Sequence, residues 1–468
     1  MNIKKTVVSV FGANIFTSAA SITGIIYFSR TMGADVLGTY FLFISVLGLI
    51  GFLANLGLPS AVEKRISEKQ PSDEILTTAL VMETLLLVPF LIVIIIFSGQ
   101  LSEYLGAEVS ILLVIALVVQ QFGTILRNAL EGELRVQNGA WYQSLQKSSW
   151  LLFAFLISSQ NLASEPLILS HIASLILMSI TVIVTMDTGL GKPKISHMKS
   201  LFDFSKYSIL GAAGGKLYNW GDVLILGFFV SSSAIGAYEI AWRVSQSVML
   251  LAQSIRRTIY PQISAWDSKD EYVQIKQLVS DAILPSAYIS IPAFFGALLY
   301  SRYILELVFT PEAGVASMAL IILMAEKIVR SIHMTISPVI MALNRPDLIV
   351  IPVAIASVSN LTLNFPLIWK FGISGAALGT GIASILGAIA YIHQLGSLIE
   401  LDIPWNGLLW CVISSASMVL ILQMINHYIV PNGVPVLISL ISLGAAIYIG
   451  ASLIHRPIRE LVFNSFPQ

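Results

Sequence analysis

Long apolar stretches follow one another along almost the whole chain, separated only by short polar segments. A bilayer core requires about 20 consecutive apolar residues per spanning helix. Of the 468 residues, 56% are hydrophobic and only 11% are charged. Backbone polar groups in hydrocarbon must be hydrogen-bonded within the protein, so stretches of this length are expected to be helices. The sequence therefore predicts an all-α integral membrane protein and excludes an ordinary water-soluble domain as its main body.

About fourteen transmembrane helices can be placed along the chain. They are expected at 7–29, 39–59, 75–97, 108–126, 143–160, 166–186, 206–230, 238–260, 278–300, 315–341, 347–369, 373–395, 406–428 and 434–454. We expect residues 1–190 and 200–396 to form two six-helix bundles, and 397–468 to add a further helix pair. A cleaved signal peptide is the alternative for the first apolar run, but that run is longer than a signal core usually is.

Basic residues outside the spans are distributed unevenly between the two sides of the membrane. With a cytoplasmic N-terminus, 18 Lys and Arg residues lie in cytoplasmic segments, and only Arg30, Arg302 and Lys370 lie in outer loops. Cytoplasmic loops of membrane proteins carry an excess of Lys and Arg. We therefore expect a multi-pass protein of the cell (inner or plasma) membrane with both termini in the cytoplasm. The longest loop, roughly 187–205, is then cytoplasmic.

An internal repeat becomes visible when the chain is compared with itself at a shift of 198 residues. VLGTYFLFIS begins at Val36 and AIGAYEIAWRVS at Ala234, so Gly38 and Tyr40 correspond to Gly236 and Tyr238. Six helices per repeat give both halves the same orientation in the membrane, as in several transporters. A substrate path is then expected at the interface between the halves.

Five basic side chains lie within the predicted spans or at their edges: Lys147, Lys216, Arg243, Lys327 and Arg330. A charge in the bilayer costs at least about 2.5 kcal/mol unless it faces protein or a watery cavity. Interior cations are therefore typical of a transporter of anionic substrates, for which they provide charge-assisted hydrogen bonds. The net charge of zero gives no indication of nucleic-acid binding, and the single cysteine and six histidines show no metal-site spacing.

Four of these cations are the main substrate-binding candidates. Lys216 lies near the middle of its span, after the small residues at 211–215, which permit close packing or local unwinding. Arg243 begins a polar helix face, although it is also close enough to the outer end to reach headgroups. Arg330 and Glu326 are four residues apart, with Lys327 on the flank, so an ion pair between Glu326 and Arg330 is an alternative to substrate binding.

Other interior polar residues support less specific hypotheses. Asn14 shares a helix face with Ser18 and Ser21, which either lines the path or packs between helices. Asp222, Glu326 and Glu83 are the candidates for binding a coupling ion, H⁺ or Na⁺. No cofactor and no metal site are expected.

Several motifs resemble one known family in their order and spacing. They are SRTMGADVLGTY from Ser29, NLGLPSAVEKR from Asn55, the Gly236-x-Tyr238 turn, YPQIS from Tyr260, and SNLTLNFPLIWKFGISGAALGTGIAS from Ser359. Together they cover about the first 395 residues. In this pattern the chain resembles the polysaccharide flippases of the multidrug/oligosaccharidyl-lipid/polysaccharide export superfamily, which include the O-antigen flippases of bacteria.

The resemblance implies two six-helix bundles around a central cavity and a transport function. The implied substrate is a polyprenyl-pyrophosphate-linked oligosaccharide, flipped from the cytoplasmic to the outer leaflet for O-antigen or another surface polysaccharide. Partners would be membrane lipids and the polymerase or glycosyltransferases of the same pathway. Two alternatives remain: a multidrug cation antiporter of the same superfamily, which would need interior carboxylates, and a membrane-embedded polysaccharide polymerase, which would normally show a large catalytic loop or a metal site.

Reporter fusions test the predicted topology. Fusions at the C-terminus and within 187–205 are both expected to report a cytoplasmic location, because the excess of basic residues marks that side. A fusion in the outer loop near Arg302 serves as the opposite control. An outward-facing signal at either of the first two places would contradict the topology.

Overall fold

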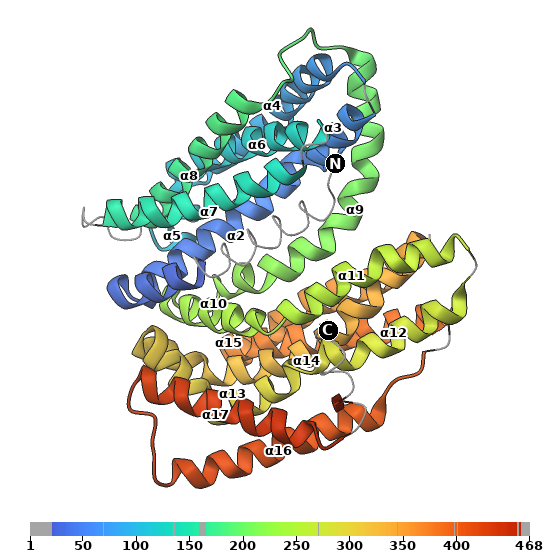
Figure 1. Cartoon of the computed structure of the whole chain (residues 1–468). Coiled ribbons are helices and arrows are strands. Elements are labelled where there is room, and N and C mark those ends of the chain that lie inside the picture. Colours follow the sequence, from blue (N-terminus) through green and yellow to red (C-terminus); the bar gives the residue numbers. More distant parts are fainter. Residues whose placement is uncertain are drawn as a thin grey trace. The chain divides into compact units, whose positions relative to one another are not determined.

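The computed structural model describes residues 21–459, except 69, 134–135, 159–164, 270, 344, 397, 400 and 456–457. Within these residues every regular element is a helix (Figure 1). Eight helical segments of this described part are long and apolar enough to cross a membrane, and two of them, Tyr272–Phe309 and Asp347–Gly396, have 38 and 50 residues. The protein is therefore an all-helical, multi-pass membrane protein. The count of fourteen spans stays a prediction.

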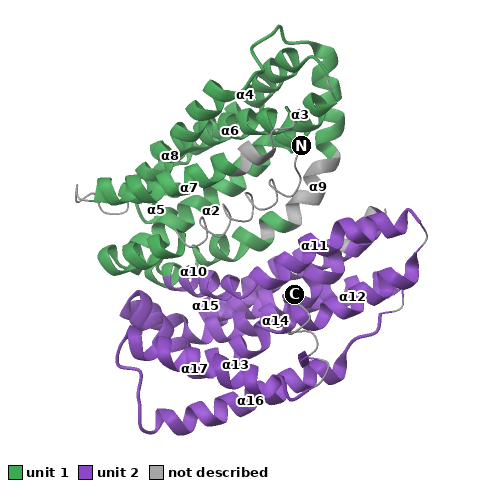
Figure 2. Ribbon diagram, in the orientation of Figure 1, with its two compact units in different colours: residues 1–236 green, residues 237–468 purple. Residues whose placement is uncertain are grey.

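The chain forms two compact units, residues 1–236 and 237–468 (Figure 2). The helices of the first unit are α2 (Ala34–Asn55), α3 (Leu58–Ser67), α4 (Ser72–Ile96), α5 (Ser98–Leu105), α6 (Ser110–Gly132), α7 (Val136–Ser158), α8 (Glu165–Thr185) and α9 (Ile195–Leu226), after a helical stretch at 21–32. Helix α9 packs against α2, α3 and α4 of the same unit. The predicted boundary between two six-helix bundles at 190–200, and the prediction that 397–468 is an additional helix pair, stay predictions.

Helix α2 ends earlier than the apolar pattern predicts. Leu56 and Gly57 have φ angles of 47° and 81°, in the left-handed region, so the span expected at 39–59 stops at Asn55. The short helix α3 follows, with Pro59 in its first turn, where proline leaves no helical hydrogen bond unmade. Its buried face joins α4 and α6 in one hydrophobic cluster.

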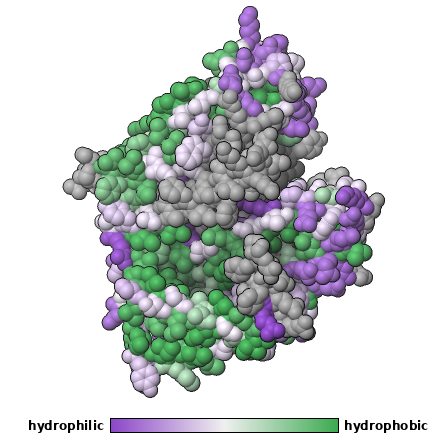
Figure 3. All heavy atoms as spheres, in the orientation of Figure 1, coloured by the Kyte–Doolittle hydropathy of each residue, from purple (hydrophilic) through white to green (hydrophobic). Residues whose placement is uncertain are grey.

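The loop between α8 and α9 is shorter than expected and is held firmly. Helix α9 already begins at Ile195, so the loop expected at 187–205 ends eleven residues early. The Gly189 N–H donates to Asp73 Oδ1 at 2.8 Å, and Lys194 Nζ lies 2.7 Å from Glu74 Oε1. These contacts fix the loop to the first turn of α4. Figure 3 shows hydrophilic side chains gathered over this loop and, in the second unit, over the α11–α12 turn.

A backbone contact joins α2 to the first turn of α10 (Ser232–Ser247). A Cβ added at Gly38 would overlap the carbonyl oxygen of Ser232, and one added at Gly236 would overlap the carbonyl oxygen of Ala34. Ala34 and Ser232 are 198 residues apart, as are Gly38 and Gly236. Such reciprocal contacts are what a local two-fold relation between two copies produces. The structure thus supports the repeat at this point.

The second unit contains the rest of α10 and the remaining helices. These are α11 (Leu250–Asp267), α12 (Tyr272–Ala287), α13 (Ser290–Tyr303), α14 (Ser317–Ala342), α15 (Val350–Gly396), α16 (Trp405–Asn426) and α17 (Val434–Ser452), with short π and 3₁₀ turns at Ile304–Phe309, Pro311–Ala316 and Pro346–Ile349. The single span expected at 238–260 is divided into α10 and α11 around Val248 and Met249.

Helix α15 is a tight hairpin of two helical arms. Gly372, with φ 55° and ψ −133°, separates the arms where the sequence places the turn between the spans 347–369 and 373–395. A side chain at Gly375 or Gly379 would overlap the opposite arm, and Asn360 Nδ2 donates to Thr380 Oγ1 at 3.1 Å. The Asn- and Gly-rich motif from Ser359 therefore has a packing role: small residues allow two backbones to approach inside a membrane.

The last helix pair is fixed to α12 and α13. Tyr300 donates to Asn426 Oδ1 at 2.9 Å, the Tyr288 and Ser452 hydroxyls are 2.7 Å apart, and Tyr448 donates to the Tyr288 carbonyl at 2.9 Å. Tyr300, Met418, Leu422 and Leu440 lie in one buried cluster. Helices α16 and α17 therefore brace the second unit.

The Gly38 contact predicts a specific destabilisation. In Gly38→Ala the new methyl group meets a backbone oxygen, which no side-chain rotation can move away. We therefore expect the free energy of unfolding to fall by roughly 1–3 kcal/mol, as at other overpacked sites. Thermal unfolding of the purified protein in detergent would measure it. Gly99→Ala is the matched control, because nothing lies within 4 Å of a Cβ there. Equal melting temperatures for the two variants would contradict the contact.

Candidate functional site

Lys216 lies on α9 with its ammonium over an aromatic ring. Lys216 Nζ is 4.5 Å from the ring centroid of Trp220, one turn further along the helix. The indole is fixed in turn by α2, because a Cβ at Gly48 would be 2.5 Å from Trp220 Cζ2. Among the described residues, burial and Arg127 are the influences on the Lys216 ammonium, and no carboxylate is one of them. The ring lowers the cost of the buried charge without neutralising it.

Polar groups of α2 and α6 lie in the same unit as Lys216. Arg127 of α6 is near enough to act on Lys216 electrostatically. Gln121 donates to the Gly51 carbonyl of α2, and Asn55 Nδ2 is 3.5 Å from Gln121 Oε1. Arg127 directly follows the span expected at 108–126, and Gln121 is not among the candidates from the sequence. The pair Gln120-Gln121 within an apolar run is the signal that points to it.

Arg243 of α10 is accompanied by an acidic residue that the sequence analysis did not select. Its Nε lies 3.3 Å from Glu239 Oε2, one turn earlier on the helix. The Arg243 side chain is one-third exposed, whereas the Glu239 side chain is buried. The i,i+4 spacing within the repeat motif could have identified this ion pair.

Lys327 and Glu326 form a completely buried ion pair on α14. Both side chains are 0% exposed, and Lys327 Nζ lies 2.5 Å from Glu326 Oε2. Lys327 Nζ is also 5.9 Å from the ring centroid of Trp242. A buried pair of this kind favours a structural role for both residues, since each charge offsets the other.

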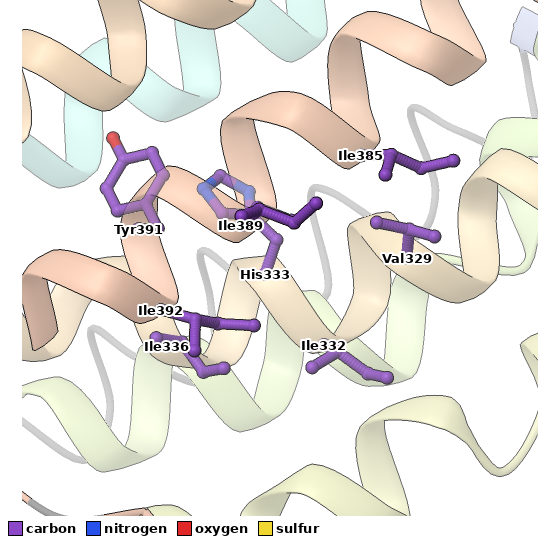
Figure 4. A pocket seen from close by; sticks show the side chains of 9 residues that line it. Val329, Ile332, His333, Ile336, Ile385, Ile389, Tyr391 and Ile392 are labelled. Atoms are coloured by element: carbon purple, nitrogen blue, oxygen red, sulfur yellow. The ribbon is translucent and has the colours of Figure 1, made fainter. Parts of the chain in front are cut away.

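Arg330 lies one turn further along α14, beside an imidazole and a phenol. The His333 and Tyr391 ring centroids are 4.3 Å apart. Arg330 and Arg256 of α11 both act electrostatically on these two groups. Helices α11, α14 and α15 thus bring two guanidinium groups to one place. His333 and Tyr391 also line a cavity between α14 and α15 (Figure 4).

The acidic candidates have different environments. Glu83 of α4 is 0% exposed, and neither of its carboxylate oxygens has a hydrogen-bond partner among the described residues. Asp222 of α9 is also buried, whereas Lys216 on the same helix is half-buried. Asn14 lies outside the described residues, and Lys147 is exposed. Within the part of the chain that the structure describes, no group of three or more metal-ligating side chains comes together.

Exposed basic residues of α3 and of the first turns of α9 are paired differently from those inside the spans. At the end of α3, hydrogen bonds from Arg65 and then Lys64 hold the pKa of the Glu68 carboxyl below its usual value. Lys206 Nζ lies 2.7 Å from Asp203 Oδ1, which is another exposed ion pair. These exposed pairs contribute little to stability.

The fold is similar to that of a protein of known structure. The structure resembles that of the lipid II flippase MurJ in its inward closed conformation, with a TM-score of 0.81 over 97% of this chain and 99% of that one, at 20% identity. The two proteins therefore share one fold over almost their whole length.

Similarity of sequence then defines the family. Residues 27–312 match the model of a family described as "Polysaccharide biosynthesis protein". Two Haloferax volcanii proteins are similar over nearly their whole length. "Probable low-salt glycan biosynthesis flippase Agl15" is 36% identical over 99% of this chain and 98% of that one, and "Probable flippase AglR" is 27% identical over 95% and 94%. The chain belongs to this polysaccharide biosynthesis family.

The Glu326–Lys327 pair predicts a non-additive effect on stability. Glu326→Gln removes the carboxylate that lies beside the buried Lys327 ammonium. We therefore expect the free energy of unfolding to fall by about 3–5 kcal/mol. The double variant Glu326→Gln/Lys327→Met removes both charges and is expected to recover most of the lost stability. Unfolding by detergent titration would measure both, with exposed Glu103→Gln as control. If Glu326→Gln is as stable as the control, the claim that the Glu326–Lys327 ion pair stabilises the fold is wrong.

Proposed function

We propose that the protein is a flippase that carries a lipid-linked oligosaccharide from the cytoplasmic to the outer leaflet of the cell membrane, for assembly of O-antigen or another surface polysaccharide. The observation that carries the proposal is the 36% identity, across almost both whole chains, to a relative named as a glycan biosynthesis flippase. It acts as a transporter rather than an enzyme. Glycosyltransferases supply its substrate and a polymerase consumes its product.

The interior cations support this function because of the chemistry of the substrate. A pyrophosphate linkage is anionic, and its transfer through hydrocarbon is very costly without cationic partners. Lys216 presents an ammonium whose charge the Trp220 ring leaves in place, and Arg127 adds a second positive charge nearby. We assign the pyrophosphate contact first to Lys216, and then to Arg330 and Arg243. Lys327, paired with Glu326, is the weakest of the four candidates.

The transport cycle is one of alternating access driven by a coupling ion, and Glu83 is our first candidate for a proton site. An ionised carboxylate that is completely buried without a partner is strongly disfavoured, so Glu83 holds a proton in this conformation. Access of water in another conformation would let the proton leave. Asp222 and Glu326 are the further candidates, with Na⁺ as the alternative ion.

The cation antiporter is less well supported than the flippase. A cationic drug requires an interior carboxylate that is available to it. Glu326 and Glu239 both lie beside basic side chains of their own helices.

Replacement of Lys216 tests the assignment. Lys216→Ala is expected to reduce transfer of the lipid-linked oligosaccharide at least tenfold, which corresponds to about 1.4 kcal/mol of lost interaction. Lys216→Arg keeps the charge and is expected to retain part of the activity. The measurement is appearance of substrate in the outer leaflet of proteoliposomes, together with the surface glycan of a complemented deletion strain.

A matched control lies on the same helix. Lys206 is exposed and paired with Asp203, so Lys206→Ala is expected to transport normally. Membrane levels of all variants are compared first. If Lys216→Ala transports as well as Lys206→Ala, the electrostatic role of Lys216 is wrong. If the wild type moves no lipid-linked oligosaccharide, the proposed function itself is wrong.

A further inference from the structure

A cavity of about 190 Å³ lies within the second unit, between α14 and the second arm of α15 (Figure 4). Its walls are aliphatic: Val329, Ile332 and Ile336 come from α14, and Ile385, Ile389 and Ile392 from α15. Ile385 and Ile389 are 45% and 58% exposed, so the cavity has an apolar mouth on the surface of a membrane-spanning hairpin. The size and lining suit a short piece of hydrocarbon chain better than water, which needs polar partners.

One polar side chain at this cavity lacks a partner. His333 Nε2 is buried and has no hydrogen-bond partner among the described residues. Its ring packs against Tyr391, whose side chain also lines the cavity (Figure 4). An unsatisfied buried nitrogen in a native structure requires an explanation, and a ligand group is one.

Positive charge converges on the same place from two helices. Arg330 precedes His333 by three residues on α14, and Arg256 belongs to the exposed face of α11; both act on His333 and on Tyr391. An anion at this place would be attracted by both guanidinium groups, and a guanidinium group can donate bidentate hydrogen bonds to it.

We propose that this is a binding site for the lipid end of the substrate, with the pyrophosphate beside Arg256 and Arg330 and the first isoprenoid units in the aliphatic cavity. The inference rests on the proposed function and adds to it the place where the carrier lipid is first recognised, before the pyrophosphate reaches Lys216. The charge pattern of the loops predicts that α11, α14 and the second arm of α15 all run towards the cytoplasmic side. The site therefore lies in the leaflet where a lipid-linked oligosaccharide assembled in the cytoplasm arrives.

Charge distinguishes this ligand from ordinary membrane lipids. A phosphodiester headgroup such as that of phosphatidylglycerol carries one negative charge, whereas a pyrophosphate diester carries two. Two guanidinium groups match the second better than the first. The aliphatic cavity adds hydrophobic contact that inorganic pyrophosphate cannot make.

Binding of farnesyl pyrophosphate to the full chain in phosphatidylcholine nanodiscs tests the site. Ile389→Trp fills the mouth of the cavity and is expected to weaken this binding about tenfold or more, while binding of inorganic pyrophosphate stays unchanged. Arg256→Gln and Arg330→Gln are expected to weaken binding of both probes. Arg256 is exposed, so its variant remains informative if the half-buried Arg330 variant fails to fold.

The control is Val358→Trp, on the other arm of α15, because Val358 is 59% exposed and does not line the cavity. Binding by Ile389→Trp that equals binding by Val358→Trp would overturn the proposal. Displacement of farnesyl pyrophosphate by an equal amount of phosphatidylglycerol would overturn it too, since the site would then hold any anionic lipid. Parallel flipping assays separate the two hypotheses: flipping by the wild type without these binding effects refutes the site alone, and the binding effects without flipping refute the proposed function.

Discussion

Charge inside a hydrocarbon layer is the constraint on which the rest of this molecule depends. Each cation within the spans has to offset the loss of water, and the structure shows several ways of doing so. Lys327 is neutralised by Glu326 at 2.5 Å, whereas Lys216 lies on the face of Trp220, which attracts the ammonium but leaves its charge in place. Of these two cations, only Lys216 keeps a net positive charge that can attract an anion. The distinction between stabilising residues and binding residues thus follows from what each charge meets within a few ångströms.

Much of the fold could be predicted from the sequence because apolar length and glycine position are local signals. The turn at Gly372 separates two helical arms where the hydropathy pattern places the boundary. The break at Leu56 and Gly57 was not predicted, because Leu56 is a non-glycine residue and such residues rarely adopt a positive φ. Division of 238–260 into two helices was missed for a similar reason: the sequence around Val248 has neither proline nor glycine.

The candidate site was less predictable, since residue type reveals that a charge is interior but not what lies beside it. Helical spacing suggested Arg330 as a partner for Glu326, and the structure shows the adjacent Lys327 beside that carboxylate. Contacts between helices, such as the one between Trp220 and Gly48, have no local signal at all. The same holds for the convergence of Arg256 and Arg330, because it depends on how α11 packs against α14. Glu83 has no obvious partner in the sequence pattern, and its carboxylate oxygens have no hydrogen-bond partner among the described residues.

The contact of α2 with the first turn of α10 has a mechanical consequence. Gly38 meets Ser232 and Gly236 meets Ala34, so one crossing point is built from two copies of the same contact, facing each other on the same two helices. Separation of the helices at one copy removes the other copy too.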